Sequence, residues 1–255
     1  MNEHIQTESF ERIRVIRFNR PDKKNALTHE MYEALIAALR EADADPAVRC
    51  ILFAGSETAF TAGNDIADFL QNPPTGSDAP VMRLLALLTE IRKPIVAAVC
   101  GPAVGIGTTL LLHCDLVACG EQTSFALPFV NLGLCVEGGA SLLLAQRVGA
   151  ARAREWLMLG EPVDAQTALE AGLVNRVVPN VQAFAEALAW AQKLAAKPPT
   201  ALLATRRLIR KGSLEATREA IASEAAEFRN LLQSAEAKEA FAAFIEKRKP
   251  DFSRF

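Results

Sequence analysis

Two similar stretches determine how this chain folds: Phe60-Thr61-Ala62-Gly63-Asn64-Asp65 and Gly101-Pro102-Ala103-Val104-Gly105-Ile106-Gly107. Each comes after an apolar segment that is predicted to be a buried strand, residues 50–54 before the first stretch and 94–99 before the second. In both stretches a strand turns sharply into a helix, and glycine allows the backbone angles of such a turn at little steric cost. Repeated strand, turn and helix predict an α/β fold in the first half of the chain.

The residues after the turn glycines, Asn64 and Ile106, stand at helix starts, where a backbone N–H group has no helical carbonyl to bind. Two such N–H groups can hold an oxyanion. The alternative is that each glycine only closes a tight turn. Neither turn assigns a function by itself.

A single acid, Glu137, follows the nearly uncharged segment 124–136. Apolar surroundings raise the pKa of a carboxyl group toward that of a useful base. The alternative is a solvated acid at a helix start, where the helix dipole favours negative charge. Together with the two turns, Glu137 predicts proton transfer and enolate chemistry on a carbonyl compound.

The composition is that of a globular protein with one large domain or two small ones, since 50% of its 255 residues are hydrophobic. The net charge of -2 and the lack of interleaved basic and aromatic residues argue against a nucleic-acid partner. The five cysteines have no C-x-x-C spacing, so we expect neither a zinc site nor a disulfide framework. With no signal peptide and no apolar run long enough to span a bilayer, a cytoplasmic location without membrane contact is expected.

Elements outside the two turns can also be predicted. The alternating segment 12–18 predicts a strand, and Thr28 is an N-cap for a helix that runs to about Ala42. Residues 71–78 concentrate helix breakers and predict a mobile loop near the first turn. From Val181 onward the composition is helical, with a helix boundary at Lys197-Pro198-Pro199.

The chain resembles the enoyl-CoA hydratase/isomerase (crotonase) superfamily. The motifs that carry the resemblance span the chain in family order: Asn19-Arg20-Pro21, Asn25-Ala26-Leu27, 60–69, 93–99 running into Gly101, Cys114-Asp115-Leu116, Leu132-Gly133-Leu134 and 244–250. The resemblance implies an α/β fold, a crotonase-like spiral of ββα units in residues 1–195, with a C-terminal helical region in 196–255. That region would support a homotrimer or a dimer of trimers and help to close the CoA pocket.

The same resemblance implies an acyl-CoA thioester substrate and no metal or redox cofactor. The enolate would be held by the backbone N–H groups of Asn64 and Ile106. Main-chain groups near Lys24 and Ala26 would bind the adenine, and Lys23 or Lys24 would lie near the phosphates. The other residues implied to contact the substrate are Ala62, Gly63, Asp65, Ile66, Gly105, Pro128, Phe129, Phe244 and Lys247.

The acids distinguish between reactions within the family. A typical hydratase has two glutamates, and Thr109 and Phe129 stand at those positions here. Hydration needs one group to activate water and another to deliver a proton. The segment around Glu137 instead resembles the peroxisomal-type Δ3,Δ2-enoyl-CoA isomerases, which implies that Glu137 is the single base. The alternatives are a hydratase or another acyl-CoA reaction on the same scaffold, and a non-catalytic acyl-CoA-binding member.

Overall fold

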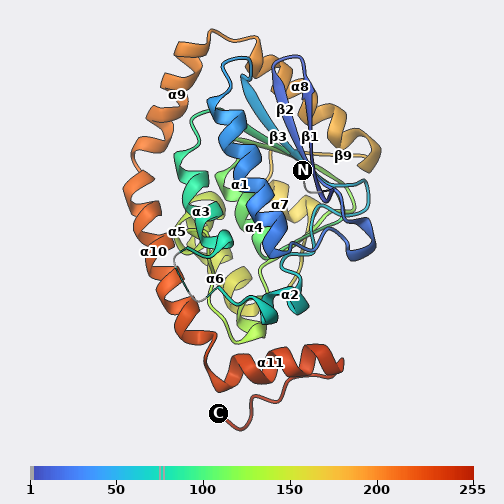
Figure 1. Ribbon diagram of the computed structural model, residues 1–255, viewed down its shortest axis with the longest axis vertical. Coiled ribbons are helices and arrows are strands. Elements are labelled where there is room, and N and C mark those ends of the chain that lie inside the picture. The colour runs from blue at the N-terminus through green and yellow to red at the C-terminus, as the bar shows by residue number, and fades with distance from the viewer. Residues whose placement is uncertain (1–2, 75, 77) are drawn as a thin grey trace.

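The computed structural model describes residues 3–74, 76 and 78–255 (Figure 1). Within these residues the strands form one six-stranded and one three-stranded sheet. The larger sheet contains, in spatial order, β1 (Ile5–Phe10), β2 (Ile13–Phe18), β3 (Cys50–Ala54), β4 (Ile95–Val99), β6 (Leu116–Gly120) and β9 (Arg176–Val178). The smaller contains β5 (Pro102–Val104), β7 (Ser124–Ala126) and β8 (Val163–Asp164). In the larger sheet only the β1–β2 pair is antiparallel, which agrees with the α/β prediction.

Helices follow both glycine turns and make up the chain from Ala183 to Glu246, as predicted. The α-helices are α1 (His29–Ala44), α2 (Ile66–Gln71), α3 (Pro80–Glu90), α4 (Ile106–Thr109), α5 (Ala140–Val148), α6 (Ala150–Leu159), α7 (Ala165–Ala171), α8 (Ala183–Ala195), α9 (Pro199–Lys211), α10 (Leu214–Leu231) and α11 (Ala235–Glu246). Short 3-10 helices are η1 (Pro21–Lys23), η2 (Leu110–His113), η3 (Val130–Leu132) and η4 (Asn180–Gln182). The predicted N-cap of α1 is confirmed, because Thr28 Oγ1 accepts a hydrogen bond from the backbone N–H of Met31.

Both faces of the larger sheet are covered by helices. Along β3, Leu52 packs in a cluster with Ala187 and Ala191 of α8, whereas Phe53 packs with residues of α1 and α3. Successive strand side chains point to opposite faces, so a strand between two helical layers is apolar at every position. This explains why residues 50–54 show no polar alternation.

The C-terminal helices wrap the core rather than forming a separate bundle. In Figure 1, α9 and α10 run along one side of the molecule and α11 crosses its lower end. α10 contacts α3 and α5, and α11 contacts η3. The predicted helix boundary at residues 197–199 is confirmed, since α8 ends at Ala195 and α9 begins at Pro199. The division into 1–195 and 196–255 stays a prediction.

Part of the predicted mobile loop, Thr75 and Ser77, lies outside the described residues. The described residues of this segment connect α2 to α3. No helix in the described parts of the chain is both long enough and apolar enough to cross a bilayer.

Candidate active site

The two glycine turns lie side by side. Thr61 forms a parallel bridge with Ala103, and backbone hydrogen bonds of 3.0 Å join Thr61 N to Pro102 O and Val104 N to Thr61 O. Asn64 lies three residues after Thr61, and Ile106 lies three residues after Ala103. The two predicted N–H donors therefore occupy equivalent positions in adjacent turns.

Glycine is required in both turns by the backbone. Gly63 has a φ of +89°, and a Cβ atom there would lie 2.8 Å from the carbonyl oxygen of Val104. Gly105 has a φ of +55° and is the N-cap residue of α4. A residue with a side chain is strained in the left-handed region, so substitution at either position displaces the adjacent N–H group.

The backbone N–H groups of Asn64 and Ile106 have no acceptor among the described residues, whereas the neighbouring N–H groups of Gly63, Asp65 and Gly105 all donate. Buried or half-buried N–H groups are nearly always paired in folded proteins. Two unpaired N–H groups in adjacent turns can bind one oxyanion.

A cavity of about 620 Å³ opens beside the two turns and is largely apolar. Most of the predicted substrate-contacting residues line it: Lys23, Ala26, Ala62, Gly63, Asn64, Asp65, Ile66, Gly105, Ile106, Pro128, Phe129 and Phe244. Lys24, Lys247 and Glu137 are not among its lining residues. Phe228 of α10 and Phe241 of α11 also line it and contact the Phe69 ring, so the C-terminal helices complete the cavity within one chain.

The predicted adenine-binding segment is itself held by hydrogen bonds. The Lys24 carbonyl accepts from Ala62 N–H at 2.9 Å, and the Ala26 carbonyl accepts from the Arg20 guanidinium at 3.0 Å. Arg20 also pairs with Asp65 at 2.7 Å. Burial raises the pKa of Asp65, but its bonds to Arg20 and to the N-terminus of α2 outweigh burial and lower it. Asp65 thus fixes the first turn against the segment before α1.

Glu137 is buried, with 5% of the residue exposed. The Thr109 hydroxyl donates to Oε1 at 2.5 Å, while Oε2 is buried with no hydrogen-bond partner in the described residues. Burial raises the pKa of Glu137 to about 8, although the Thr109 bond opposes this shift and the charge of Glu224 adds to it. A carboxyl with one free oxygen and a pKa near neutrality is suited to accept and return a proton.

Three side chains fix the loop that carries Glu137. Besides Thr109, His113 Nε2 donates to the carbonyl of Gly138 at 2.7 Å, and the Glu224 carboxylate accepts from Gly139 N–H at 2.6 Å. Glu224 also accepts from the backbone N–H of Ser141 at 2.8 Å, so it caps the N-terminus of α5 from α10. Burial lowers the pKa of His113 to about 4, so its ring is neutral and donates from Nε2.

Tyr32 of α1 is hydrogen-bonded to the first turn. Its hydroxyl donates to Asn64 Oδ1 at 2.5 Å, and its side chain is buried. Burial raises the pKa of Tyr32, and the negative charge of Glu137 raises it further. The Glu137 carboxyl lies close to the second turn, because Thr109, which holds its Oε1, belongs to α4, the short helix that begins at Ile106.

The two positions at which a hydratase has glutamates are occupied as the sequence indicated. Thr109 is buried and holds Glu137, and Phe129 is buried with its ring facing Gly105. Neither side chain can exchange a proton as a carboxyl does.

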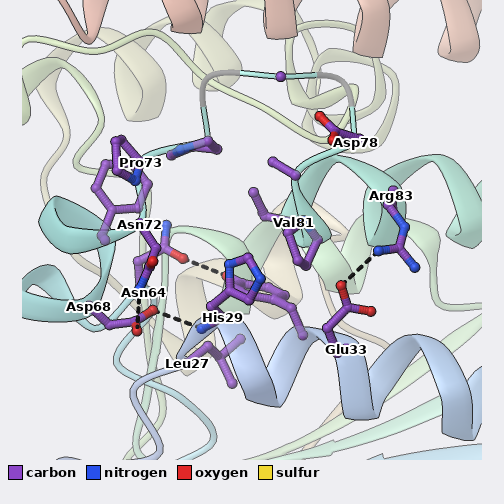
Figure 2. A pocket seen from close by; sticks show the side chains of 16 residues that line it. Leu27, His29, Glu33, Asn64, Asp68, Asn72, Pro73, Asp78, Val81 and Arg83 are labelled. Atoms are coloured by element: carbon purple, nitrogen blue, oxygen red, sulfur yellow. Dashed lines mark hydrogen bonds and ion pairs between the residues drawn. The ribbon is translucent and has the colours of Figure 1, made fainter.

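A second cavity of about 450 Å³ is lined by residues of α1, α2 and α3 and by described residues of the connection between α2 and α3 (Figure 2). Asn64 and Phe69 line both cavities, so the two meet at the first turn. Tyr32 lines the second cavity, and His29 points into it in Figure 2.

Several of these groups were not predicted from the sequence. These are Tyr32, His113 and Glu224. A signal for Glu224 exists in the sequence, because it lies three residues after Ile221 and four before Phe228 on the buried face of α10. An acid on such a face needs a partner.

Comparison with known proteins gives consistent matches over nearly the whole chain. The sequence profile of the family described as enoyl-CoA hydratase/isomerase matches residues 8–254. A probable enoyl-CoA hydratase of Rhizobium meliloti (strain 1021) is 37% identical over 257 residues, which cover 98% of each chain. The structure of Pseudomonas aeruginosa OdaA is 44% identical with a TM-score of 0.93, covering 96% of this chain and 99% of that one. An enoyl-CoA hydratase/isomerase from Pseudoalteromonas atlantica T6c is 39% identical with a TM-score of 0.93, covering 98% and 100% of the two chains.

Proposed function

The chain belongs to the enoyl-CoA hydratase/isomerase family and has the crotonase fold, and we propose that it isomerises a 3-enoyl-CoA thioester to the 2-trans isomer. The observation that carries this proposal is the buried carboxyl of Glu137, with one oxygen held by Thr109 and the other free. Thr109 belongs to α4, which begins at Ile106, so this carboxyl lies close to the second turn. The N–H groups of Asn64 and Ile106 have no acceptor among the described residues.

In the proposed reaction the Glu137 carboxylate removes a proton from C2 of the substrate. The electrons pass to the thioester oxygen, which becomes an enolate held by the N–H groups of Asn64 and Ile106. The protonated carboxyl then returns the proton at C4, and the double bond comes to lie between C2 and C3. One base is enough because the proton is taken up and given back, so no metal or redox cofactor is required by this chemistry.

Hydration is the second candidate, because the Rhizobium meliloti relative is described as a probable enoyl-CoA hydratase. Hydration adds water across the double bond and needs a group to activate that water. Thr109 and Phe129 stand where a two-glutamate hydratase has its acids, and the Phe129 ring covers the turn at Gly105. An apolar ring at this point keeps water away from the enolate, which favours isomerisation.

The proposed substrate position places the CoA moiety in the larger cavity, near Lys23 and Ala26. The half-exposed Phe244 at the cavity would cover the bound thioester. Lys24 and Lys247 do not line the cavity. We propose that they lie at its margin, where their ammonium groups attract the phosphates of CoA across solvent.

A homotrimer or a dimer of trimers is also proposed. The C-terminal helices expose large apolar side chains, including Leu208 at 65%, Ile209 at 77% and Ile245 at 62%. Exposed apolar surface of this kind is typical of protein interfaces. Light scattering at micromolar concentration is expected to give a trimer or a multiple of three, and a monomer would contradict this proposal.

The experiment that tests the proposed function measures isomerisation of a 3-enoyl-CoA and hydration of a 2-trans-enoyl-CoA of equal chain length with the same enzyme. The expected result is a higher kcat/KM for isomerisation. Hydration that equals or exceeds isomerisation would contradict the proposal. Binding of CoA esters without turnover of either substrate would identify a non-catalytic family member.

A further inference from the structure

The segment before α1 sets the direction of the Asn64 N–H group. Leu27 and Asn64 form a parallel bridge. Leu27 N–H donates to the Gly63 carbonyl at 2.8 Å, and the Leu27 carbonyl accepts from Asp65 N–H at 2.9 Å. These bonds use the residues on either side of Asn64, so the N–H and C=O groups of Asn64 itself point to the opposite side. The backbone therefore turns the Asn64 N–H group away from Leu27.

The side chain of Asn64 is held separately, by Tyr32 near the start of α1. The Tyr32 hydroxyl donates to Asn64 Oδ1 at 2.5 Å. Tyr32 lies on the helix whose N-cap, Thr28, directly follows Leu27. The backbone and the side chain of Asn64 are thus both attached to the beginning of α1. The second turn has a different arrangement, because the side chain of Ile106 is apolar and is packed in the core.

The Tyr32 hydroxyl is not needed to fill the core. The residue is 4% exposed, and its hydroxyl has no hydrogen-bond partner other than Asn64 among the described residues. A phenylalanine would fill the same space without burying a polar group that needs a partner. The bond to Asn64 is therefore what the hydroxyl adds to the structure.

A fixed side chain limits the movement of the Asn64 backbone. Rotation of the backbone that swings the Asn64 N–H group also moves its Cβ atom, and this strains the bond to Tyr32. Asn64 follows Gly63, and a glycine backbone has more conformational freedom than that of any other residue. Oxyanion donors are effective because they are held in place before the charge develops. The bond from Tyr32 supplies such a restraint directly after the flexible residue.

We propose that Tyr32 is a positioning residue for the first oxyanion donor: its hydroxyl holds the Asn64 side chain and thereby keeps the Asn64 N–H group directed at the thioester oxygen. This inference rests on the proposed function in one respect, because it takes the thioester oxygen to bind the N–H groups of Asn64 and Ile106. It does not depend on which proton transfer follows.

The test compares binding of two CoA thioesters of equal chain length, so it does not require turnover. Acetoacetyl-CoA is a β-keto thioester that can bind as its enolate, whereas butyryl-CoA lacks the keto group and stays a neutral thioester. Tyr32→Phe removes the hydroxyl, and Asn64→Ala removes the amide that it holds while keeping the backbone N–H group. Calorimetry would measure the affinity of both esters for each variant, after thermal unfolding has shown that the variant is folded.

Each single variant is expected to bind acetoacetyl-CoA between about twofold and tenfold more weakly, the range of one net hydrogen bond, and to bind butyryl-CoA as the wild type does. Because both changes remove the same restraint, the double variant should lose no more than either single variant. Thr89→Val is the matched control, since it also removes a buried hydroxyl, one that donates to the Ala86 carbonyl at 2.7 Å. This control should bind both esters as the wild type does.

The outcomes separate this inference from the proposed function. Equal losses for the two esters, or losses that multiply in the double variant, would overturn the inference and leave the isomerase proposal standing. Wild-type affinity of Asn64→Ala for acetoacetyl-CoA would also overturn it, whether or not Tyr32→Phe folds. Binding of neither ester by the wild type would overturn both proposals. The expected pattern in an enzyme without isomerase activity would overturn the proposed reaction alone.

Discussion

The two turns and the Glu137 loop supply different parts of the candidate site and are built in different ways. The turns present backbone N–H groups of Asn64 and Ile106, and hydrogen bonds between neighbouring segments hold them together. The Glu137 loop presents a side chain and is held by Thr109, His113 and Glu224. Glu224 lies 85 residues after Gly139 in the sequence.

This difference separates two requirements of the proposed reaction. A pair of oxyanion donors needs fixed backbone geometry, which glycine turns in adjacent segments provide. A base needs a shifted pKa and a fixed side chain, which require burial and partners from several elements. Substitutions in the two regions should therefore have different kinetic effects.

The largest effect is expected for Glu137→Gln. The amide keeps the size of the side chain but cannot accept a proton, so isomerisation should fall about a thousandfold or more. Steady-state kinetics would measure the loss, and calorimetry should show nearly unchanged binding of a CoA ester. Glu30→Gln on the exposed face of α1 is the control and should keep full activity. Turnover close to that of the wild type would remove Glu137 from the mechanism.

The next largest effect is expected for Gly63→Ala, which disturbs a turn and leaves the base intact. The added Cβ meets the Val104 carbonyl at 2.8 Å and the residue is forced out of its φ of +89°, so the Asn64 N–H group moves. Loss of one oxyanion donor costs about a hundredfold in kcat. Gly212→Ala is the matched control, because a Cβ there meets no atom within 4 Å. Equal activity of the two variants would show that the first turn does not act on the oxyanion.

The pH dependence tests the base without a substitution. A carboxyl whose pKa is raised to about 8 by burial is protonated below that pH and then cannot accept the C2 proton. Below the pKa, kcat/KM for isomerisation should fall about tenfold for each pH unit. A rate that stays constant from pH 6 to pH 9 would contradict a base with a raised pKa.

A smaller effect is expected for Glu224→Gln, which acts on the Glu137 loop from α10. The amide removes a negative charge that raises the pKa of Glu137, so the midpoint of the pH profile should move to lower pH. It also leaves an N–H donor of Gly139 or Ser141 less well satisfied, and kcat should fall by about tenfold or less with little change in KM. An unchanged pH midpoint would show that Glu224 does not influence the base.

Much of the fold could be predicted from local patterns. The apolar segments of β3 and β4, the Thr28 cap and the boundary at Pro199 depend on neighbouring residues, and the structure confirms them. The short strands β5, β7 and β8 were not predicted, because two or three residues carry no periodicity and are held by pairing with distant segments.

The candidate site likewise has a part that could be predicted from local motifs and a part that depends on contacts between distant residues. The turn residues and most of the cavity wall follow from motifs, and the structure brings them together around one cavity. The contacts of Tyr32, His113 and Glu224 could not be predicted, because each joins residues at least 25 positions apart. The second cavity was also not predicted, since its polar wall is assembled from three helices and the connection between α2 and α3.

Transfer of deuterium within the substrate tests the central claim most directly, namely that Glu137 alone carries the proton from C2 to C4. A 3-enoyl-CoA with deuterium at C2 would be converted in a single turnover in ordinary water, and the 2-trans product would be analysed by mass spectrometry and NMR. Because Glu137 is only 5% exposed and its Oε2 is buried, the account predicts that part of the deuterium appears at C4. A product whose C4 hydrogen comes entirely from water would contradict it.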